Sequence, residues 1–397
     1  MKSGFGKKNR IHLKKAYVQK VNTDDKTLYL AGGGQLTYDK LVIATGSKPN
    51  KFGWPGQDLK GVLGLYHKQD LENLERYAPN NEVCKRAVIV GGGLIGIELA
   101  EMLSSRSIPV TFLVRESSFW NGVLPEGEST MINRHILSHH IDLRLSTNLK
   151  EIKANDKGRV KSVIIEETKE EIACDLVGLT AGVSPNIDFL KSSKIALGKG
   201  VLVNRQLETN VKDVFAIGDC AEQQKAIGNR QPIESVWYTG RMMGETLAQT
   251  LCGNRRSYKP GHWFNSAKFF DIEYQTYGWV HGMKGKPEYE EQFHWIHKDD
   301  DKCITVAYHK NTRLFLGINT FGIRMRHEIF DRWLTEERDV DYVMEHLEEA
   351  NFDPEFYSRY ENQILKAFTT VFKQYKMSNK LHLSMSLAKP DALHITN

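Results

Sequence analysis

The sequence lacks the patterns of membrane proteins, secreted proteins and nucleic-acid-binding proteins. Its 397 residues contain no run approaching the 18 or so apolar residues that a membrane-spanning helix needs, and no secretory signal is recognisable. The formal net charge is only +5, and the lysines and arginines are interspersed with nearly as many acids, which is typical of a solvated surface rather than a nucleic-acid site. We therefore expect a cytoplasmic protein that binds neither membrane nor nucleic acid.

Cysteine is also scarce, and the chain lacks a C-x-x-C pair or any other metal-ligand spacing of cysteines. The five cysteines are Cys84, Cys174, Cys220, Cys252 and Cys303. Reduced thiols in a cytoplasmic protein are the simplest interpretation. The pair His139-His140 is assigned to the surface because no further histidine or carboxylate is expected at ligand spacing. The sequence analysis therefore predicts no metal site.

The most informative segment that is present reads K-R-A-V-I-V-G-G-G-L-I-G-I-E-L-A-E-M-L, from Lys85 to Leu103. Ala87 to Val90 form a short apolar run typical of a strand buried in a parallel sheet. Ile95 to Leu103 carry apolar residues at helical spacing. Strand, glycine loop and helix thus follow one another in the order that dinucleotide binding requires.

Each glycine of this loop has an expected role. Gly91 allows the tight turn, Gly93 lets the backbone approach a pyrophosphate, and Gly96 lets the helix pack closely on the strand. The amides of Leu94 and Ile95 at the helix start would then face the phosphates. We interpret the segment as a dinucleotide site; the alternative is a glycine-rich turn without a ligand.

Two further strand-to-turn segments carry polar groups. K-L-V-I-A-T-G-S-K-P, from Lys40 to Pro49, ends its strand at Ala44, Thr45 and Gly46. D-V-F-A-I-G-D-C-A-E, from Asp213 to Glu222, places Gly218 and Asp219 after a buried strand. A carboxylate there can accept hydrogen bonds from a ribityl or sugar hydroxyl, and a helix expected to follow would present its N-terminus to phosphate. Each segment alone is a weak signal.

Four motifs together resemble the pyridine nucleotide-disulfide oxidoreductase superfamily. They are A-T-G-S-x-P, G-G-G-L-I-G, A-G-V-S-P-N at Ala181 to Asn186, and I-G-D-C-A, and their order and spacing match over about residues 10 to 290. The resemblance implies an NAD(P) domain nested in an FAD domain. It places Ala44, Thr45 and Gly46 on the FAD side and Gly91, Gly93 and Gly96 at the NAD(P) pyrophosphate. It further places Gly182 at the nicotinamide nucleotide, and Gly218 and Asp219 at the ribityl-phosphate portion of the flavin.

The chain departs from that superfamily in one respect, since no G-x-G-x-x-G strand and helix precede Lys40. The expected fold is therefore α/β with nested FAD and NAD(P) doubly wound domains, the FAD domain being incomplete at its N-terminus, plus an α+β C-terminal domain. We also expect weak FAD binding by this polypeptide alone. Since 397 residues exceed one ordinary core, we predict several domains. They are an FAD remnant and linker (1–81), the NAD(P) domain (82–205), the second FAD segment (206–256) and the C-terminal interface domain (257–397).

The C-terminal region is predicted to hold strands such as F-F-D-I-E-Y-Q-T-Y-G and C-I-T-V-A-Y-H, followed by charged amphipathic helices from Met325 to Lys376. Within these helices, Ile329, Trp333 and Leu334 form an apolar stripe. We assign it to the core or to a subunit interface, which leaves a homodimer open.

Two side chains are candidates for the reaction that the resemblance implies, hydride transfer from NAD(P)H to FAD. Glu98 follows Gly96 by two positions, and the matching glutamate of similar enzymes lies near the nicotinamide; the alternative is a solvated carboxylate beside Glu101. Trp237 precedes Gly244 in a pattern that resembles ferredoxin reductases of oxygenase systems, where the tryptophan lies by the flavin. Its alternative is packing in the domain core.

The strand after the glycine loop, V-T-F-L-V, ends at Val114 and is followed by Arg115 and Glu116. An acid at that strand end would bind the ribose of NAD, whereas a guanidinium can pair with the 2'-phosphate of NADP. We therefore favour NADPH over NADH, although Glu116 opposes this choice.

The electron acceptor is not fixed by the sequence. No His-Pro dipeptide occurs, which argues against a glutathione-type disulfide reductase. We expect an FAD-dependent NAD(P)H oxidoreductase that passes electrons to a small ferredoxin-like or rubredoxin-like carrier. The alternatives are an NAD(P)H oxidase, peroxide or disulfide reductase whose cysteine lies upstream, and an inert nucleotide-binding module.

Overall fold

The computed structural model describes residues 8–299, 301–353, 355–356 and 358–372. They form two compact units that the chain enters twice each. Unit 1 holds the described residues up to Asn50 together with Gly182–Pro260, and unit 2 holds Lys51–Ala181 together with the described residues from Gly261 onward. The described residues contain no helix that is both long and apolar enough to cross a membrane.

The crossings between the units differ from the boundaries 81/82 and 205/206 predicted from the sequence. Strand β6 (Val62–Leu63) pairs in parallel with β13 (Leu176–Leu179), and this pairing places the predicted linker in unit 2. Strand β14 (Val183–Pro185) pairs antiparallel with β5 (Ser47–Pro49), so unit 1 resumes at Gly182. Short strand pairs of this kind carry little sequence signal, which is why the predicted boundaries do not follow them.

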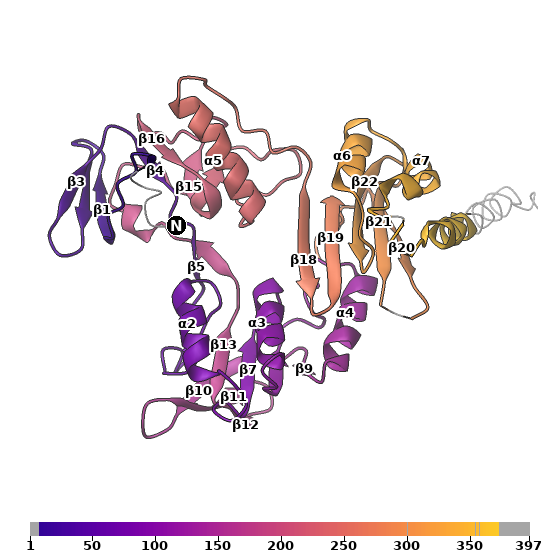
Figure 1. Ribbon diagram of the computed structural model, residues 1–397, viewed down its shortest axis with the longest axis horizontal. Helices are drawn as coiled ribbons and strands as arrows, with labels where there is room; N and C mark the ends of the chain where they lie inside the picture. The colour runs from indigo at the N-terminus through magenta and orange to yellow at the C-terminus, as the bar shows by residue number, and fades with distance from the viewer. Residues whose placement is uncertain (1–7, 300, 354, 357, 373–397) are drawn as a thin grey trace, which may run out of the picture. The chain divides into compact units, whose positions relative to one another are not determined.

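Unit 2 is built around a five-stranded parallel sheet in the order β6-β13-β7-β8-β9. Figure 1 labels β7, β9 and β13 of this sheet. The strands and helices of this part are β7 (Ala87–Val90), β8 (Val110–Leu113), β9 (Asp142–Arg144), α2 (Lys68–Tyr77), α3 (Leu94–Ser104) and α4 (Glu126–Ser138). Three antiparallel strands form a separate small sheet, namely β10 (Leu149–Ala154), β11 (Val160–Ile165) and β12 (Glu171–Ala173). The predicted strand, loop and helix around the glycines are thus present as β7 and α3.

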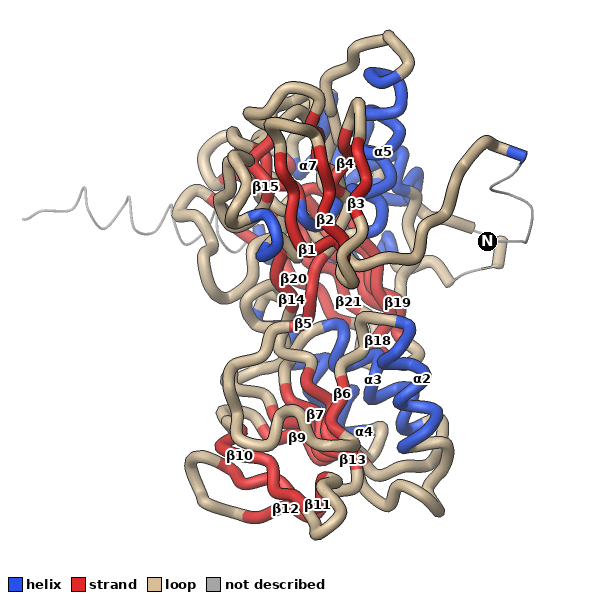
Figure 2. The backbone as a smooth tube through the Cα atoms, turned by 90° about the vertical axis from the view of Figure 1, so that its left-hand side faces the viewer, coloured by secondary structure: helices blue, strands red, loops and turns tan. Residues whose placement is uncertain are grey.

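The alternation of side chains along β7 explains how this sheet is covered on both faces. Ala87 and Ile89 pack in a core with α2, α3 and α4, whereas Val88 and Val90 pack in another with β10 and β11. All four are buried because successive residues of a strand point to opposite faces. Figure 2 shows α2 and α3 on one side of β7 and the strands β10 to β12 on the other.

The C-terminal part of unit 2 is an antiparallel sheet in the order β18-β19-β22-β21-β20. Its elements are β18 (Phe264–Phe269), β19 (Ile272–Gly278), β20 (Glu290–Ile296), β21 (Cys303–His309), β22 (Phe315–Phe321), α6 (His327–Thr335), α7 (Val340–Glu345), η3 (Leu347–Ala350) and a helix over 361–372. The end of the predicted helical region, up to Lys376, lies outside the described residues.

This C-terminal part shares a hydrophobic core with the parallel-sheet part of unit 2. Phe269 meets Phe119 edge to face, with ring centroids 6.2 Å apart, and also contacts Phe321. The predicted apolar stripe packs into a second core, where Trp333 is fully buried, so the stripe is core rather than subunit interface. One predicted strand, F-F-D-I-E-Y-Q-T-Y-G, is instead broken by a hairpin turn at Phe270 and Asp271.

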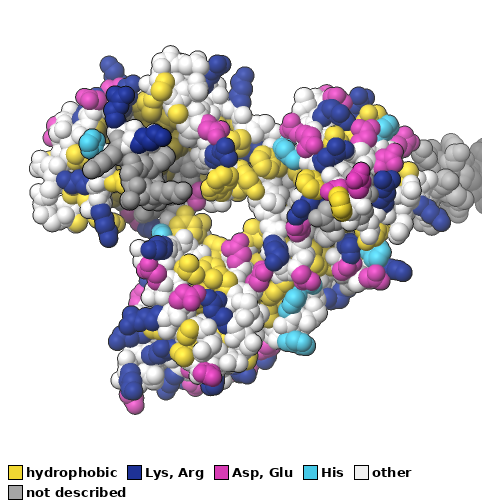
Figure 3. All heavy atoms as spheres, viewed as in Figure 1, with side chains coloured by type: hydrophobic (Ala, Val, Ile, Leu, Met, Phe, Trp, Pro, Cys, Tyr) yellow, Lys and Arg dark blue, Asp and Glu magenta, His cyan; other side chains and the backbone are white. Residues whose placement is uncertain are grey.

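Unit 1 consists of short strands and one long helix. Its elements are β1 (Val18–Asn22), β2 (Thr27–Leu30), β3 (Gln35–Thr37), β4 (Leu41–Ile43), β5, β14, η1 (Asp188–Leu190), β15 (Val201–Val203), β16 (Val214–Ala216), η2 (Gly218–Cys220), β17 (Ala221–Gln223) and α5 (Trp237–Leu251). Strands β4 and β16 form a parallel pair. Charged side chains of both signs are interspersed over the face shown in Figure 3.

Candidate functional site

The glycine loop of unit 2 excludes side chains at its first and last glycine. Gly91 has a φ of +121°, and a Cβ there would lie 2.6 Å from the carbonyl oxygen of Thr180. A Cβ at Gly96 would lie 2.5 Å from the carbonyl oxygen of Gly91 and 2.7 Å from Phe112 Cζ. The turn and the close packing of α3 on the sheet therefore both require glycine.

The middle glycine, Gly93, faces open space, because no heavy atom lies within 4 Å of where its Cβ would be. Gly93 is the N-cap of α3, and the first intrahelical hydrogen bond runs from Ile97 N to Gly93 O at 3.2 Å. The amides of Leu94, Ile95 and Gly96 precede that bond, so they are donors at the positive end of the helix dipole. Room beside Gly93 and donors beyond it fit a pyrophosphate.

Thr180 and Gly92, neither of which was predicted to matter, also shape this loop. Thr180 Oγ1 lies 3.0 Å from the carbonyl oxygen of Val90 and 3.2 Å from that of Gly91, which holds the end of β7 against β13. A Cβ at Gly92 would lie 2.7 Å from Val114 Cγ1. The signal for Thr180 was its place directly after a buried strand, in L-T-A-G.

In the segment after β8, a buried residue, Val114, is followed directly by an exposed cation, Arg115. Val114 is fully buried, so its side chain is not available to a ligand. The Arg115 side chain is 76% exposed, and its Nη2 lies 2.9 Å from Glu116 Oε1. Arg115 is therefore accessible from solvent, but its guanidinium is engaged by the carboxylate that follows it.

Glu98 lies on α3 and lines a surface groove with Leu65, Glu101, Met102 and Ser105. Partial burial, and then the negative charge of Glu101, raise the pKa of Glu98. Glu101 itself pairs with Lys268 at 2.9 Å. The Glu98 carboxyl thus sits beside a like charge at the edge of α3.

In unit 1, the pairing of β4 with β16 brings together two segments far apart in the sequence. Ile217 N donates to the carbonyl oxygen of Ile43 at 3.0 Å, which continues the pairing beyond the strand ends. Ser47 Oγ then donates to Asp219 Oδ2 at 3.2 Å. The segment Ala44-Thr45-Gly46 leads directly into Ser47, and so lies at the same strand ends as Gly218 and Asp219. Ser47 was missed, although it belongs to the A-T-G-S-x-P motif.

Two backbone positions near this cluster adopt left-handed conformations that favour glycine. Gly46 has a φ of +63° and accepts a hydrogen bond from Asn186 N at 2.9 Å, while Thr45 Oγ1 donates to the carbonyl oxygen of Asn186 at 2.8 Å. Gly182 has a φ of +84° and accepts from Asn50 N at 3.0 Å. These bonds join the ATG and AGVSPN motifs within unit 1.

The helix predicted to follow Asp219 is not there, since a three-residue 3-10 turn, η2, and then β17 take its place. Helix α5 packs against η2 from later in the chain, with Gly218 N lying 3.3 Å from Met243 Sδ. A Cβ at Gly218, where φ is +71°, would meet nothing within 4 Å. The backbone at Gly218 therefore borders open space, as a flavin-phosphate contact would need.

Trp237 is the first residue of α5 and is 69% exposed, which removes the alternative that it packs into the domain core. Its ring meets Tyr238 edge to face at a centroid distance of 5.6 Å, and the Arg241 guanidinium lies 5.6 Å from its centroid. An exposed indole held by its neighbours is suited to stack on a planar ligand.

The prediction for the pair His139-His140 was wrong in part. His140 is exposed, but His139 Nε2 lies 3.1 Å from Asp271 Oδ1, and His135 Nε2 lies 2.9 Å from the same oxygen. The signal overlooked was the four-residue spacing between His135 on α4 and His139 at the C-cap of that helix. Asp271 lies 132 residues from His139 in the chain and could not have been found from spacing.

Comparison with known proteins assigns the chain to a family. Residues 4–244 match the pyridine nucleotide-disulphide oxidoreductase profile, which is more than half of the chain. The chain belongs to the pyridine nucleotide-disulphide oxidoreductase family. The glycine loop and the ATG, AGVSPN and GDCA motifs described above all fall within the matched range, so the family resemblance expected from the sequence is confirmed.

Two curated relatives of this oxidoreductase carry different activities. The chain is 31% identical over 244 residues to an NAD(P)H sulfur oxidoreductase (CoA-dependent) of Pyrococcus abyssi, covering 61% of this chain and 53% of that protein. It is 30% identical over 263 residues to the ferredoxin reductase subunit of a 5,5'-dehydrodivanillate O-demethylase from a Sphingobium strain, covering 66% and 62% respectively. The chain thus spans less than two thirds of the length of either relative.

A solved structure supports the fold over most of the chain. An FAD-dependent pyridine nucleotide-disulphide oxidoreductase from Desulfovibrio vulgaris superposes with a TM-score of 0.74 at 22% identity, covering 91% of this chain and 90% of that one. The similarity confirms the expected α/β fold with a further C-terminal domain. The family's enzymes use FAD and NAD(P)H.

Proposed function

We propose that this oxidoreductase transfers a hydride from NADPH to FAD and passes the electrons on to a small carrier protein of the ferredoxin or rubredoxin kind. The observation that carries the proposal is the glycine loop of unit 2, in which Gly91 and Gly96 admit no side chain while Gly93 opens onto free space. Such a loop at a helix N-terminus is built for a dinucleotide pyrophosphate.

The residues of each unit have separate tasks in this proposal. Nicotinamide supplies the hydride, and flavin takes it up and releases electrons to the acceptor. In unit 2, the amides of Leu94, Ile95 and Gly96 hold the coenzyme pyrophosphate and orient it. In unit 1, Asp219, fixed by Ser47, accepts hydrogen bonds from ribityl hydroxyls, and the Trp237 indole covers one side of the ring system.

Arg115 supports the choice of NADPH over NADH. It is the exposed cation directly after β8, and the buried Val114 stands where an NAD-binding acid would be. In this proposal the 2'-phosphate displaces Glu116 from the guanidinium and takes up the fork that the carboxylate now occupies.

Three buried cysteines of this chain are unsuited to act as the nucleophile of a disulfide reductase, so that alternative needs a cysteine upstream of Lys40. Burial is the main factor that raises the pKa of Cys84 to about 11 and that of Cys174 to about 12. Cys220, which directly follows Asp219, is also buried, and burial raises its pKa. A protonated thiol is a poor nucleophile, so none of these three fits attack on a disulfide. The similarity to a ferredoxin reductase subunit is what supports a carrier protein as the acceptor.

Binding and reduction of the cofactors test the proposal. The full chain is mixed with FAD and titrated anaerobically with NADPH; loss of the visible flavin absorption is expected, and transfer to a ferredoxin or rubredoxin should follow. Gly93→Ala is the matched variant, since its Cβ meets nothing in the protein but fills the space proposed for the pyrophosphate. Coenzyme binding equal in this variant and the parent would contradict the proposed site.

Two outcomes would replace the proposed acceptor. Rapid reduction of a persulfide or of coenzyme A disulfide, with no activity toward carrier proteins, would favour the activity of the Pyrococcus relative. NADPH binding without any flavin reduction would favour a nucleotide-binding module. A homodimer remains a prediction, and the elution volume of the purified chain tests it.

A further inference from the structure

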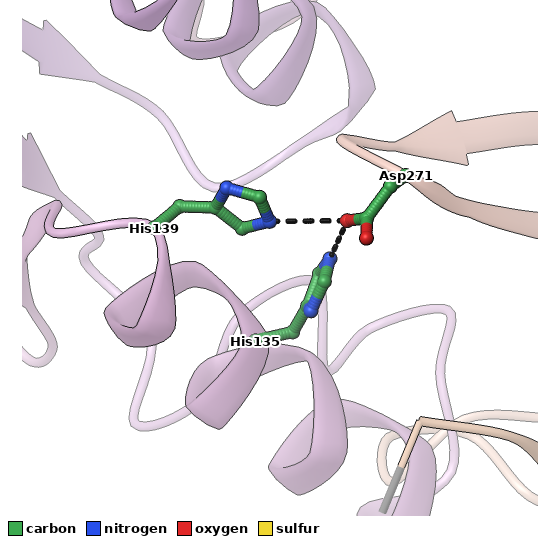
Figure 4. Close-up of side chains that lie close together, drawn as sticks. All are labelled: His135, His139 and Asp271. Carbon is green, nitrogen blue, oxygen red and sulfur yellow. Dashed lines mark hydrogen bonds and ion pairs between the residues drawn. The ribbon is translucent and has the colours of Figure 1, made fainter.

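Three potential metal ligands converge between the C-terminal end of α4 and the turn from β18 to β19, and none of them belongs to the glycine loop or to the Ser47–Asp219 cluster (Figure 4). Asp271 Oδ1 lies 2.9 Å from His135 Nε2 and 3.1 Å from His139 Nε2. The two histidines are four residues apart, so they lie on one face of the helix. The aspartate comes from the turn between β18 and β19.

The turn that presents Asp271 is held in a costly conformation. Phe269 pairs with Ile272 across the hairpin, which leaves Phe270 and Asp271 as its two-residue turn. Phe270 has a φ of +55°, a region that turns of this kind normally fill with glycine, asparagine or aspartate. A bulky aromatic there must be held by its surroundings.

Contacts with the two histidines hold that turn in place. The Phe270 ring stacks on His139 with centroids 4.2 Å apart and planes 14° apart. In the metal-free chain His135 Nε2–H also donates to the carbonyl oxygen of Phe269 at 3.1 Å, a bond that an ion bound at Nε2 would replace. The hairpin and the helix are therefore fitted to each other at the point where the three ligand atoms meet.

We propose that His135, His139 and Asp271 form a binding site for a divalent transition-metal ion of the zinc class, which fastens the β18–β19 hairpin to α4. Two imidazole nitrogens and one carboxylate oxygen are a donor set that zinc accepts. Zinc bonds of about 2.0 Å in a tetrahedron separate neighbouring ligand atoms by about 3.3 Å. The two nitrogen-to-oxygen separations of 2.9 and 3.1 Å are close to that edge, and all three ligand atoms lie within 4.8 Å of one another, so side-chain movements would admit the ion.

The site is open to solvent on one side, so an ion can enter there and a water molecule can serve as its fourth ligand. The Asp271 side chain is 75% exposed and that of His139 is 33% exposed, whereas that of His135 is 14% exposed. A water molecule can therefore complete the tetrahedron from the open side. The packed face of the site, formed by His135 and Phe270, keeps two ligands oriented before the ion arrives.

The same geometry has a metal-free explanation, in which one carboxylate accepts hydrogen bonds from two histidine N–H groups. The two explanations differ in their response to zinc and cobalt. A hydrogen-bonded cluster gains nothing from either ion, whereas a metal site is stabilised because the ion binds the folded chain.

The test is to treat the full chain with a chelator, remove the chelator, and titrate the chain with zinc chloride. We expect one zinc per chain with a dissociation constant in the micromolar range or tighter, and a rise of several degrees in the melting temperature. Cobalt in place of zinc should give the visible absorption of a tetrahedral site. A parent chain whose melting temperature zinc leaves unchanged, and in which no binding is detected, would overturn the proposal.

Variants locate the ion and separate binding from folding. His139→Ala and Asp271→Asn should each weaken zinc binding at least tenfold; Asp271→Asn is the safer variant because that side chain is mostly exposed. His140→Ala is the matched control, since His140 is exposed next to His139, and Cys252→Ser removes an exposed thiol. Both controls should bind zinc as the parent does. Loss of binding in either control, or its retention in Asp271→Asn together with His139→Ala, would place the ion elsewhere and refute the site.

Discussion

The glycine loop of unit 2 (Gly91 to Gly96), proposed to bind the coenzyme, and the cluster around Ser47 and Asp219 of unit 1, proposed to bind the flavin, are built in opposite ways. They are called the coenzyme loop and the flavin-side cluster below. The loop is a single continuous segment whose strand, β7, is buried on both faces by separate cores. The flavin-side cluster joins Ser47 to Asp219 across 172 residues of sequence, on a parallel pair of three-residue strands. Val42 of β4 is 37% exposed, whereas every residue of β7 is buried. One site is thus rigid and local, and the other is composite and lightly covered.

This difference decides what a mutation can report. In unit 2, a methyl group added at Gly91 should disturb folding, whereas one added at Gly93 should disturb only coenzyme binding. In unit 1, Thr45 and Trp237 are exposed although Ser47 is buried, so substitutions at Thr45 and Trp237 should affect the reaction more than stability.

The largest effect is expected from Gly91→Ala in the coenzyme loop. Its Cβ would lie 2.6 Å from the carbonyl oxygen of Thr180, the residue after β13, and its φ of +121° is unfavourable for alanine. We expect a loss of about 3 kcal/mol or more in unfolding free energy, from strain and overpacking together. Chemical denaturation measures it. The comparison is Gly93→Ala, which should keep the parental stability and bind NADPH at least tenfold more weakly.

If Gly91→Ala proved as stable as the parent, the loop would not be rigid and the contrast between the two units would lose its basis. Equal stability of both variants, with coenzyme binding also unchanged in both, would argue that the pyrophosphate lies elsewhere.

The sequence predicted the local structure of the glycine loop well and the contacts of the composite cluster only in part. Gly91, Gly93 and Gly96 form the expected loop because strand, turn and helix signals were adjacent. Thr45 and Asp219 were singled out separately, but nothing in the sequence showed that Ser47 joins them, since that contact depends on the β4–β16 register. The hairpin at Phe270 was missed for a similar reason, because an aromatic at a positive φ carries no turn signal.

The second prediction concerns the core that unit 2 shares with its C-terminal sheet. Glu128 on α4 is fully buried and accepts a hydrogen bond from Asn319 Nδ2 at 2.9 Å. Burial raises the pKa of Glu128 to about 7, against the opposing hydrogen bonds from Thr305 and Asn319. The folded chain therefore holds a proton that the unfolded chain has released between about pH 4.5 and pH 7.

Because the folded pKa is raised, this carboxyl lowers stability as pH rises through that window, by about 3 kcal/mol in total. Glu128→Gln should remove this loss, so the variant should be more stable than the parent at pH 8 and closer to it at pH 5. Glu126→Gln, exposed at the start of the same helix, is the control and should follow the parent at both pH values. Parallel pH profiles for Glu128→Gln and the parent would show that Glu128 is not protonated in the folded chain.

The third prediction tests the lightly covered site through Trp237. Trp237→Ala should change the unfolding free energy by less than about 1 kcal/mol because the side chain is mostly exposed, yet slow flavin reduction by NADPH about tenfold. Trp333→Ala, at a fully buried position, should instead cost about 3 to 5 kcal/mol. Stopped-flow reduction and denaturation separate the two effects. An early-melting Trp237→Ala with the parental reduction rate would assign this residue to packing.

The smallest effect is expected at Arg115, which lies after β8 in unit 2 and, unlike the glycines of the loop, has an exposed side chain. Arg115→Ala should weaken NADPH binding about fivefold, or about 1 kcal/mol, and leave NADH binding unchanged, because only NADPH carries the 2'-phosphate. Glu116→Gln should strengthen NADPH binding by a smaller factor, since Glu116 now holds the guanidinium at 2.9 Å. Fluorescence titration with each reduced coenzyme measures both. A parent chain that binds NADH several-fold more tightly than NADPH would reverse the assignment, and Arg115 would then be an ordinary surface cation paired with its neighbour.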